Sequence, residues 1–431
     1  MPHRLDARQP GFEAQFAEFL TGKREAQQDV NDAVVAIIAE VRNRGDAALI
    51  DYTRRFDRME LRADQIRLAG TAIDDAAAQC PTDVRDALHF AAERIESYHR
   101  KLMPSDIDYR DASGAQLGAR WRPVASVGLY VPGGAAAYPS SVLMNAVPAR
   151  VAGVKRLAMV VPTPGGTLNP AVMAAAQIAG VTEIYRVGGA QAVAALAYGT
   201  ATIAAVDKIV GPGNAYVAAA KRLVFGQVGI DMIAGPSEIL VVADGANDPA
   251  WIAMDLLSQA EHDEAAQAIL ITNDEGFAAQ VERAVEAELS RSPRAAIARA
   301  SWAAHGAIIL VQRLDDAVAL VDRIAPEHLE LAVAEPEPLS QRIQNTGAIF
   351  LGRYAPEAVG DYVAGPNHVL PTARSARFSS GLGVHDFLKR TSLVRCDAES
   401  LARLGPAAIR LARAEGLEAH ARAIAIRLNL P

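Results

Sequence analysis

The sequence is poor in cysteine: only two occur in 431 residues, Cys80 and Cys396. Neither belongs to a Cys-x-x-Cys pair, so the sequence indicates neither a disulfide framework nor a thiolate zinc site. Packing or surface positions account for both residues. The chain is therefore left without a credible cysteine nucleophile.

Long apolar runs and dense basic stretches are also absent. Residues 1–19 have no continuous apolar stretch of the kind that a secretory signal contains, and polar or charged residues interrupt residues 142–161. We therefore expect a cytoplasmic protein with no membrane span. The net charge of −7, without a block of Lys and Arg, argues against nucleic acid as a partner.

What remains is an ordinary globular composition, 51% hydrophobic and 22% charged, in a chain long enough for two or more domains. In residues 32–42 and 87–101, apolar side chains recur at three- and four-residue spacing, which predicts helices. Further on, short β-branched runs alternate with glycine-rich turns and helical patterns, as is typical of βαβ units in a parallel sheet. The expected strands form two series, the first at 126–131, 156–161, 183–187 and 207–210, and the second at 239–242, 268–272, 307–311 and 348–351.

The expected fold is therefore α/β, with two partial doubly wound units side by side. We predict a mostly helical region at 1–125, part of which packs on the second unit, a first unit at 126–237 and a second at 238–382. A helical tail at 383–431 completes the chain, with helices at 401–414 and 418–428. A peripheral tail of this kind often packs on a neighbouring subunit.

Polar residues lie at the glycine-rich ends of the first strand series. Ligands of open α/β sheets bind beyond the carboxyl ends of the strands, where Tyr130, Gln191 and Asn214 are expected. The dinucleotide fingerprint GxGxxG is absent, because the run 211–216 begins like it but lacks the last glycine. The pattern alone therefore leaves a nicotinamide site and simple turn chemistry both open.

A second set of polar residues points to a metal site. Asp248-Pro249 predicts a helix start, and on that helix Gln259 and His262 share one face, so both can reach one cation. Asp361 and His420, far downstream, could complete a site of nitrogen and oxygen donors if the fold brings them in. The alternative for the helix is an ordinary solvated polar face.

Pro326-Glu327-His328 places a carboxylate beside an imidazole, the usual pair for moving protons near neutral pH. The proline predicts the start of a new turn, with both side chains at its N-terminus. Alternatively, Glu327 only complements a helix dipole and His328 packs. In the tail, Glu415 and His420 fit surface positions, and the loop residue His368 stays open as a site residue.

With these segments in view, the chain resembles the histidinol dehydrogenases. The resemblance covers essentially the whole chain, because several long motifs occur in the order found in that family. The motifs are Gly229-Ile-Asp-Met-Ile-Ala-Gly-Pro-Ser-Glu238, Val187-Gly-Gly-Ala-Gln-Ala, Val210-Gly-Pro-Gly-Asn-Ala, Leu257-Ser-Gln-Ala-Glu-His and Pro326-Glu-His-Leu-Glu.

The resemblance implies a fold, an oligomeric state and a role for each candidate site residue. It implies two incomplete Rossmann-like parallel-sheet domains with helical N- and C-terminal extensions, and a homodimer whose tails reach the neighbouring subunit's site. The implied zinc ligands are Gln259, His262, Asp361 and, from the partner subunit, His420. The implied substrate contacts are these ligands together with Ser237, His328 and Glu415; NAD⁺ contacts are Tyr130, Gln191 and Asn214; the catalytic pair is Glu327 and His328.

The reaction implied is a four-electron oxidation of L-histidinol through L-histidinaldehyde to L-histidine, with two NAD⁺ consumed.

Other functions stay open on the residues alone. A zinc hydrolase would use the same glutamate and histidines but leaves Tyr130, Gln191 and Asn214 unexplained. A two-lobed solute-binding protein would suit the twin units but lacks the expected signal peptide. Some relatives oxidise other primary alcohols, and the presence of Glu415 and His420 favours histidinol.

Overall fold

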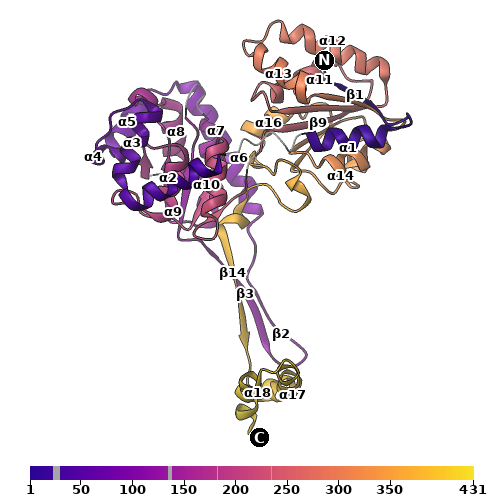
Figure 1. Cartoon of the computed structure of the whole chain (residues 1–431). Helices are drawn as coiled ribbons and strands as arrows, with labels where there is room; N and C mark the ends of the chain where they lie inside the picture. Colours follow the sequence, from indigo (N-terminus) through magenta and orange to yellow (C-terminus); the bar gives the residue numbers. More distant parts are fainter. Residues whose placement is uncertain (23–29, 134–137, 182, 234) are drawn as a thin grey trace.

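The computed structural model of the chain describes residues 1–22, 30–133, 138–181, 183–233 and 235–431. Figure 1 shows two α/β units side by side and a long ribbon that carries the C-terminal helices away from both. Each unit is built on a parallel sheet, so the predicted α/β class is confirmed. No helix among the described residues has the length and apolar character needed to cross a membrane.

The first unit contains a five-stranded parallel sheet in the order β6-β5-β4-β7-β8. Its strands are β4 (Ser126–Tyr130), β5 (Arg156–Val160), β6 (Glu183–Tyr185), β7 (Lys208–Val210) and β8 (Gly229–Ile230). The four predicted strands of the first series are present. Every residue of β4 is buried, which agrees with a sheet covered by helices on both faces.

Helices from two parts of the chain cover this sheet. One face packs against α7 (Pro139–Ala152), α8 (Pro170–Ala179), α5 (Gly70–Ala78) and α6 (Thr82–Lys101). The other face packs against α9 (Gly189–Tyr198), α10 (Ala215–Val224), α2 (Asn31–Arg44) and α3 (Asp46–Asp57). The short α4 (Ala63–Ile66) lies between α3 and α5 in the chain. The helices predicted before residue 120 therefore belong to the first unit.

The second unit contains a six-stranded parallel sheet in the order β1-β11-β10-β9-β12-β13. Its strands are β9 (Glu238–Ala243), β10 (Gln267–Thr272), β11 (Ala307–Leu310), β12 (His328–Ala332), β13 (Ala348–Leu351) and the N-terminal β1 (His3–Asp6). Its helices are α1 (Phe12–Gly22), α11 (Pro249–Ala260), α12 (Glu275–Leu289), α13 (Ala295–His305), α14 (Ala317–Ile324), α15 (Pro336–Ser340) and α16 (Glu357–Tyr362).

One prediction for this unit is wrong. Glu327 and His328 do not start a helix, because residues 328–332 form β12 between β9 and β13. Leu329 and Leu331 are fully buried in the core of the unit. Hydrogen bonding to a strand on each side outweighs the local preference that the preceding proline suggests.

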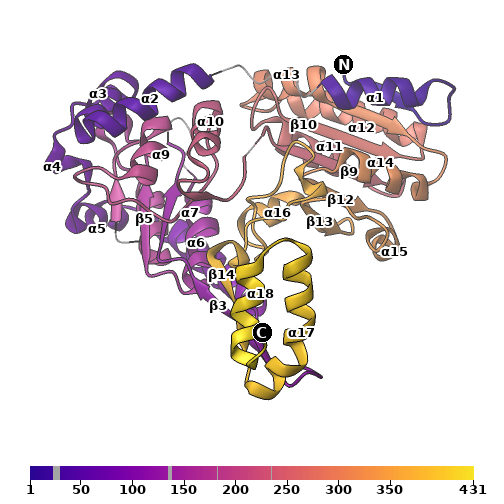
Figure 2. The same ribbon diagram turned by 60° about the horizontal axis from the view of Figure 1, so that its bottom comes forward.

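A three-stranded antiparallel ribbon was not expected from the sequence. It consists of β2 (Ile107–Arg110), β3 (Gln116–Pro123) and β14 (Leu388–Arg395), in the order β14-β3-β2. All residues of β2 and most of β14 are exposed, and β14 does not alternate apolar and polar residues as a half-buried strand does. β2 alternates but has only four residues. At its far end lie α17 (Ala398–Ala414) and α18 (Glu418–Ala425), as Figures 1 and 2 show.

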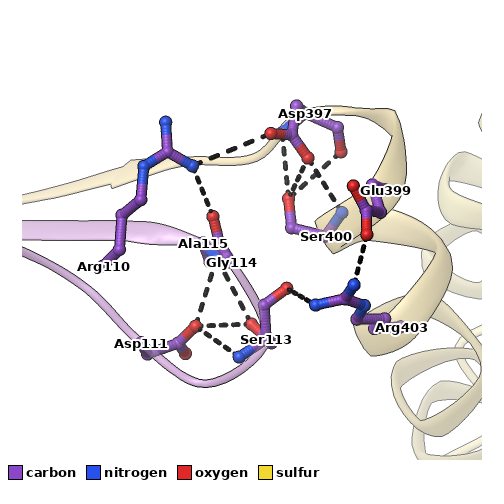
Figure 3. Close-up of polar contacts among 9 residues, drawn as sticks. All are labelled: Arg110, Asp111, Ser113, Gly114, Ala115, Asp397, Glu399, Ser400 and Arg403. Atoms are coloured by element: carbon purple, nitrogen blue, oxygen red, sulfur yellow. Dashed lines mark hydrogen bonds and ion pairs between the residues drawn. The ribbon is translucent and has the colours of Figure 1, made fainter.

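Polar contacts fasten the helical tail to the tip of the ribbon (Figure 3). Asp397 caps α17 by accepting the Ser400 N–H at 2.9 Å and lies 3.8 Å from the Arg110 guanidinium. Arg403 on α17 donates to the Ser113 carbonyl at 3.4 Å, in the turn between β2 and β3. The tail therefore has a defined place at the end of the ribbon, away from both units.

Candidate active site

The imidazole of His328 is buried at the start of β12, with 4% of the residue exposed. Its Nδ1 lies 3.0 Å from the carbonyl oxygen of Glu238 on the adjacent β9. A carbonyl can only accept, so Nδ1 carries the proton and Nε2 of the neutral ring has a free lone pair. Burial lowers the pKa of His328 to about 4, which keeps the ring neutral.

The carboxyl of Glu327 lies on the same stretch of backbone. Its Oε2 accepts the Glu238 N–H at 2.9 Å and lies 3.7 Å from His328 Nδ1. Burial, with the nearby charges of Glu238, Asp361 and Glu357, raises the pKa of Glu327 well above its usual value. A divalent cation bound among these carboxyls would favour their ionised forms.

Two carboxyls of α16 face the free nitrogen of His328. Glu357 Oε1 lies 3.6 Å and Asp361 Oδ1 4.0 Å from His328 Nε2. One ligand atom from each of these three residues lies within 4.8 Å of the others, a spacing at which one metal ion could be held. Burial, reinforced by Asp361, raises the pKa of Glu357 to about 9. Sequence reasoning missed Glu357, although it precedes Asp361 by four residues on one helix face.

The helix predicted to carry Gln259 brings it to the same region. α11 is capped by Asp248 as expected, and Ser258 Oγ lies 3.5 Å from Glu357 Oε2. Gln259 is 1% exposed, and its Oε1 has no hydrogen-bond partner within the described parts of the chain. Leaving a buried amide oxygen unpaired costs about 1–3 kcal/mol, so this atom suits a cation ligand.

Two further histidines surround the cluster. His262, exposed just after α11, contributes to lowering the pKa of His328. His368 places Nδ1 2.9 Å from the Asp361 carbonyl, and burial lowers its pKa too. Neutral imidazole nitrogens and carboxylate or amide oxygens form a donor set that suits Zn²⁺. Gln259, His262 and Asp361 thus fit the ion that the sequence motifs imply.

The cluster lies where the second unit meets the first. The chain after α16 crosses to the first unit: Asn367 Nδ2 donates to the Met144 carbonyl of α7 at 2.6 Å, and Arg94 of α6 donates to the Ala364 carbonyl at 3.0 Å. Phe387 then joins the hydrophobic core of the first unit. Ser237, at the start of β9, is partly exposed, and its carbonyl accepts the Gln267 N–H at 3.0 Å.

The three residues that the resemblance to the family assigns to NAD⁺ lie at the carboxyl ends of strands in the first sheet or in the helix starts that follow them. Tyr130 ends β4, and its hydroxyl accepts the Gly189 N–H at the start of α9 at 3.0 Å. Gln191 is buried in the first turn of α9, and Asn214 caps α10 by accepting the Val217 N–H at 3.2 Å. Burial raises the pKa of Tyr130 and keeps its hydroxyl neutral.

This edge has features that suit a dinucleotide. The carboxyl ends of parallel strands meet there, where open α/β sheets bind their ligands. The N-cap of α9 is Gly188, which provides no side-chain cap. A helix start without a side-chain cap presents N–H groups and a positive dipole end, which suits a phosphate.

Two predicted site residues lie near neither the His328 cluster nor the proposed NAD⁺ site of their own chain. Glu415 follows α17 and His420 lies on α18, and both are exposed. Figure 1 shows these helices at the far end of the ribbon, remote from both sheets. If they act at such a site, it is that of another subunit.

Comparison with known proteins identifies a family over nearly the whole chain. Residues 20–428 match the family model described as histidinol dehydrogenase. The chain is 67% identical over 430 residues to the histidinol dehydrogenase of Rhodospirillum rubrum, covering 100% of this chain and 99% of the relative. Identity to that of Bradyrhizobium diazoefficiens is 62%, covering 100% of both. The crystal structure of histidinol dehydrogenase from Elizabethkingia anophelis superposes with a TM-score of 0.95 at 35% identity, covering 99% of this chain and 98% of that one.

Proposed function

Because the chain belongs to the histidinol dehydrogenase family of histidine biosynthesis, we propose that it oxidises L-histidinol through L-histidinaldehyde to L-histidine with two NAD⁺. One observation carries this proposal best. The free Nε2 of the buried His328 faces the carboxyls of Glu357 and Asp361, close to the helix that bears the unpartnered Gln259 oxygen.

The substrate is held by a metal centre and polar side chains. Gln259, His262 and Asp361 of one subunit, with His420 of a second, would hold one Zn²⁺. Bound there, the ion would supply a fixed positive charge that helps to orient the substrate. Ser237 and Glu415 add contacts to the substrate. The partly exposed Ser237, at the start of β9, suits such a contact.

His328 acts as the base of both oxidation steps. The Glu238 carbonyl holds its Nδ1–H and thereby directs the Nε2 lone pair towards the α16 carboxyls. Nε2 takes the proton of the alcohol while a hydride passes from carbon to NAD⁺, held by Tyr130, Gln191 and Asn214. In the second step the same nitrogen takes the hydroxyl proton of the aldehyde hydrate.

Glu327 prepares the second step. An aldehyde must first gain an oxygen or sulfur nucleophile before it can release a hydride. Cys80 is buried in the core of the first unit and Cys396 directly follows β14 at the far end of the ribbon, so neither supplies a thiol to the His328 region. The ionised Glu327 would instead take a proton from water, which then adds to the aldehyde carbon.

Exposed apolar side chains in the C-terminal tail are an argument for the proposed homodimer. Several large apolar side chains of α17 and the chain beyond it are exposed in the single chain: Leu404, Leu411, Leu417 and Ile426. Clustered exposed apolar groups are typical of interfaces. Two free cysteines agree with a reducing compartment such as the cytoplasm.

The stoichiometry of NADH tests the proposal. The purified protein should form two NADH per L-histidinol consumed, because both oxidations occur before release. A chelator should abolish the reaction, and Zn²⁺ should restore it. One NADH per substrate would indicate a simple alcohol dehydrogenase; none, with hydrolysis of another substrate, would indicate the zinc hydrolase.

A pair of variants tests the division of roles. Glu327→Gln should slow chiefly the aldehyde step, because the alcohol step does not need an activated water. His328→Ala should slow both steps, since the base is lost. The rates are measured separately with L-histidinol and with added L-histidinaldehyde. Rapid oxidation of the aldehyde by Glu327→Gln would contradict the assignment.

A further inference from the structure

A buried ion pair lies near the carboxyl ends of the strands of the first sheet, where NAD⁺ is proposed to bind. Lys221 on α10 contacts the carboxylate of Asp231, which follows β8. Their side chains are 3% and 1% exposed. Removing two charges from water costs several kcal/mol per ion, so a buried pair is weak evidence of stabilisation. Its other contacts show what it does.

Both members of the pair hold the same residue, Gly211. Lys221 Nζ donates to the Gly211 carbonyl at 2.9 Å, and Asp231 Oδ2 accepts the Gly211 N–H at 2.8 Å. Gly211 has a φ of +115°, and a Cβ there would overlap with the carbonyl oxygen of Tyr130. The backbone at the end of β7 is therefore held from both sides in a conformation that only glycine adopts readily.

Gly211 lies between two residues assigned to NAD⁺. Tyr130 ends the neighbouring strand β4, paired with β7 through Leu129 and Val210. Asn214 follows three residues after Gly211 and starts α10. The second oxygen of Asp231 accepts the Met232 N–H at 2.6 Å, at the start of the segment that leads to Ser237. The pair thus links the loop at residues 211–214 to the connection between the two units.

We infer that Lys221 and Asp231 are positioning residues for the dinucleotide: they fix the loop at residues 211–214 so that Asn214 and Tyr130 face it together. This inference rests on the proposed use of NAD⁺. A pair that served stability alone could be exchanged for neutral groups without an effect on NAD⁺.

The test is a neutral double variant, Lys221→Met with Asp231→Asn, which leaves no unpaired buried charge and keeps an acceptor for the Gly211 N–H. KM for NAD⁺ and Kd for NADH, the latter from NADH fluorescence without histidinol, should both rise about tenfold, equivalent to 1.4 kcal/mol. KM for L-histidinol and zinc content should stay within about twofold, since the second unit is untouched.

A second double variant, Lys221→Gln with Asp231→Asn, restores a donor towards Gly211 and should recover part of the lost affinity. The matched control is Arg156→Met with Glu183→Gln, because this half-buried pair lies at the opposite, amino ends of β5 and β6. The control should leave NADH binding unchanged.

Parental NADH affinity in the folded Met variant, or an equal loss in the control, would overturn the inference. Failure of the parent itself to bind NADH would instead reject the proposed function. Should the Met variant fail to fold, the Gln variant alone decides by its NADH affinity.

Discussion

At the scale of single residues, burial decides the chemistry of this site. His328, Glu327 and Glu357 are ordinary titratable side chains, yet all three are buried within one cluster. Desolvation favours the neutral form of each, so the pKa of the imidazole falls while those of the carboxyls rise. One carbonyl, that of Glu238, then determines which imidazole nitrogen is free.

Asp255, on α11 four residues before Gln259, gives a prediction about pH. Burial raises its pKa from 3.8 to about 6. Between these values the folded chain keeps a proton that the unfolded chain releases, so this group makes stability fall as pH rises from about 4 to about 6. Relative to the parent, Asp255→Asn, which is neutral at every pH, should therefore be stabilised by about 1 kcal/mol more at pH 7 than at pH 5.

The measurement is the Tm difference between variant and parent at both pH values, with chelator and fixed protein concentration. The control is Asp6→Asn. The hydrogen bond with Arg8 lowers the pKa of Asp6 to about 2, so this group is ionised in both states from pH 5 to pH 7. The Asp6→Asn difference should stay constant across that range. A constant difference for Asp255→Asn would contradict the prediction.

At the scale of elements, α11 shows how packing places the proposed zinc ligands. Its apolar face, including Ile252 and Leu256, belongs to the core of the second unit. Gln259 in its last turn and His262 just beyond it are placed by that packing. The spacing of polar residues identified this helix correctly, because an amphipathic helix is encoded locally.

Asp248 at the other end of α11 supports a prediction on stability. Its carboxylate accepts the Ala250 N–H at 2.8 Å. Asp248→Ala should cost about 1 kcal/mol and lower Tm by roughly 2–4 °C, whereas Asp248→Asn keeps the cap and should cost less. Zinc content, measured by metal analysis, should not change because the proposed ligands Gln259 and His262 lie at the opposite end of α11. A large loss of zinc would show that the cap controls the ligands.

At the scale of the whole molecule, the ribbon separates the tail from its own chain's site. This arrangement gives the dimer proposal a sharp test by co-expression of two inactive variants. If His420 acts in the neighbouring subunit, a mixed dimer of His420→Ala and His262→Ala chains contains one intact site. Random pairing should then restore about one quarter of the parental activity.

The matched control co-expresses His262→Ala with Gln259→Ala. Both of these proposed ligands come from the same chain, Gln259 from the last turn of α11 and His262 from just beyond it. A mixed dimer therefore has one defect in each site and should stay inactive. Activity is followed as NADH formation from L-histidinol. Absence of recovery by the His420→Ala mixture, with mixed dimers demonstrated by tagged purification, would show that His420 does not act in the partner.

Predictions from the sequence were wrong or incomplete where contacts between residues distant in the chain determine the structure. The helix start expected at Glu327 is a strand because β9 and β13 pair on either side of residues 328–332. The ribbon escaped detection because the exposed β14 carries no hydrophobic alternation and β2 has only four residues, all of them exposed. Glu357 was missed because an isolated glutamate on a short helix has no local signal of burial.

By itself, the amino-acid sequence determined the α/β class, the two series of strands, the helical tail and, through its motifs, the family. These properties follow from short-range periodicity and from runs of specific residues. Only the tertiary structure decided that Glu357 and His368 border His328, which imidazole nitrogen is free and how far the tail lies from the units. Such features arise from strand pairing and burial between residues distant in the chain, and no local pattern encodes them.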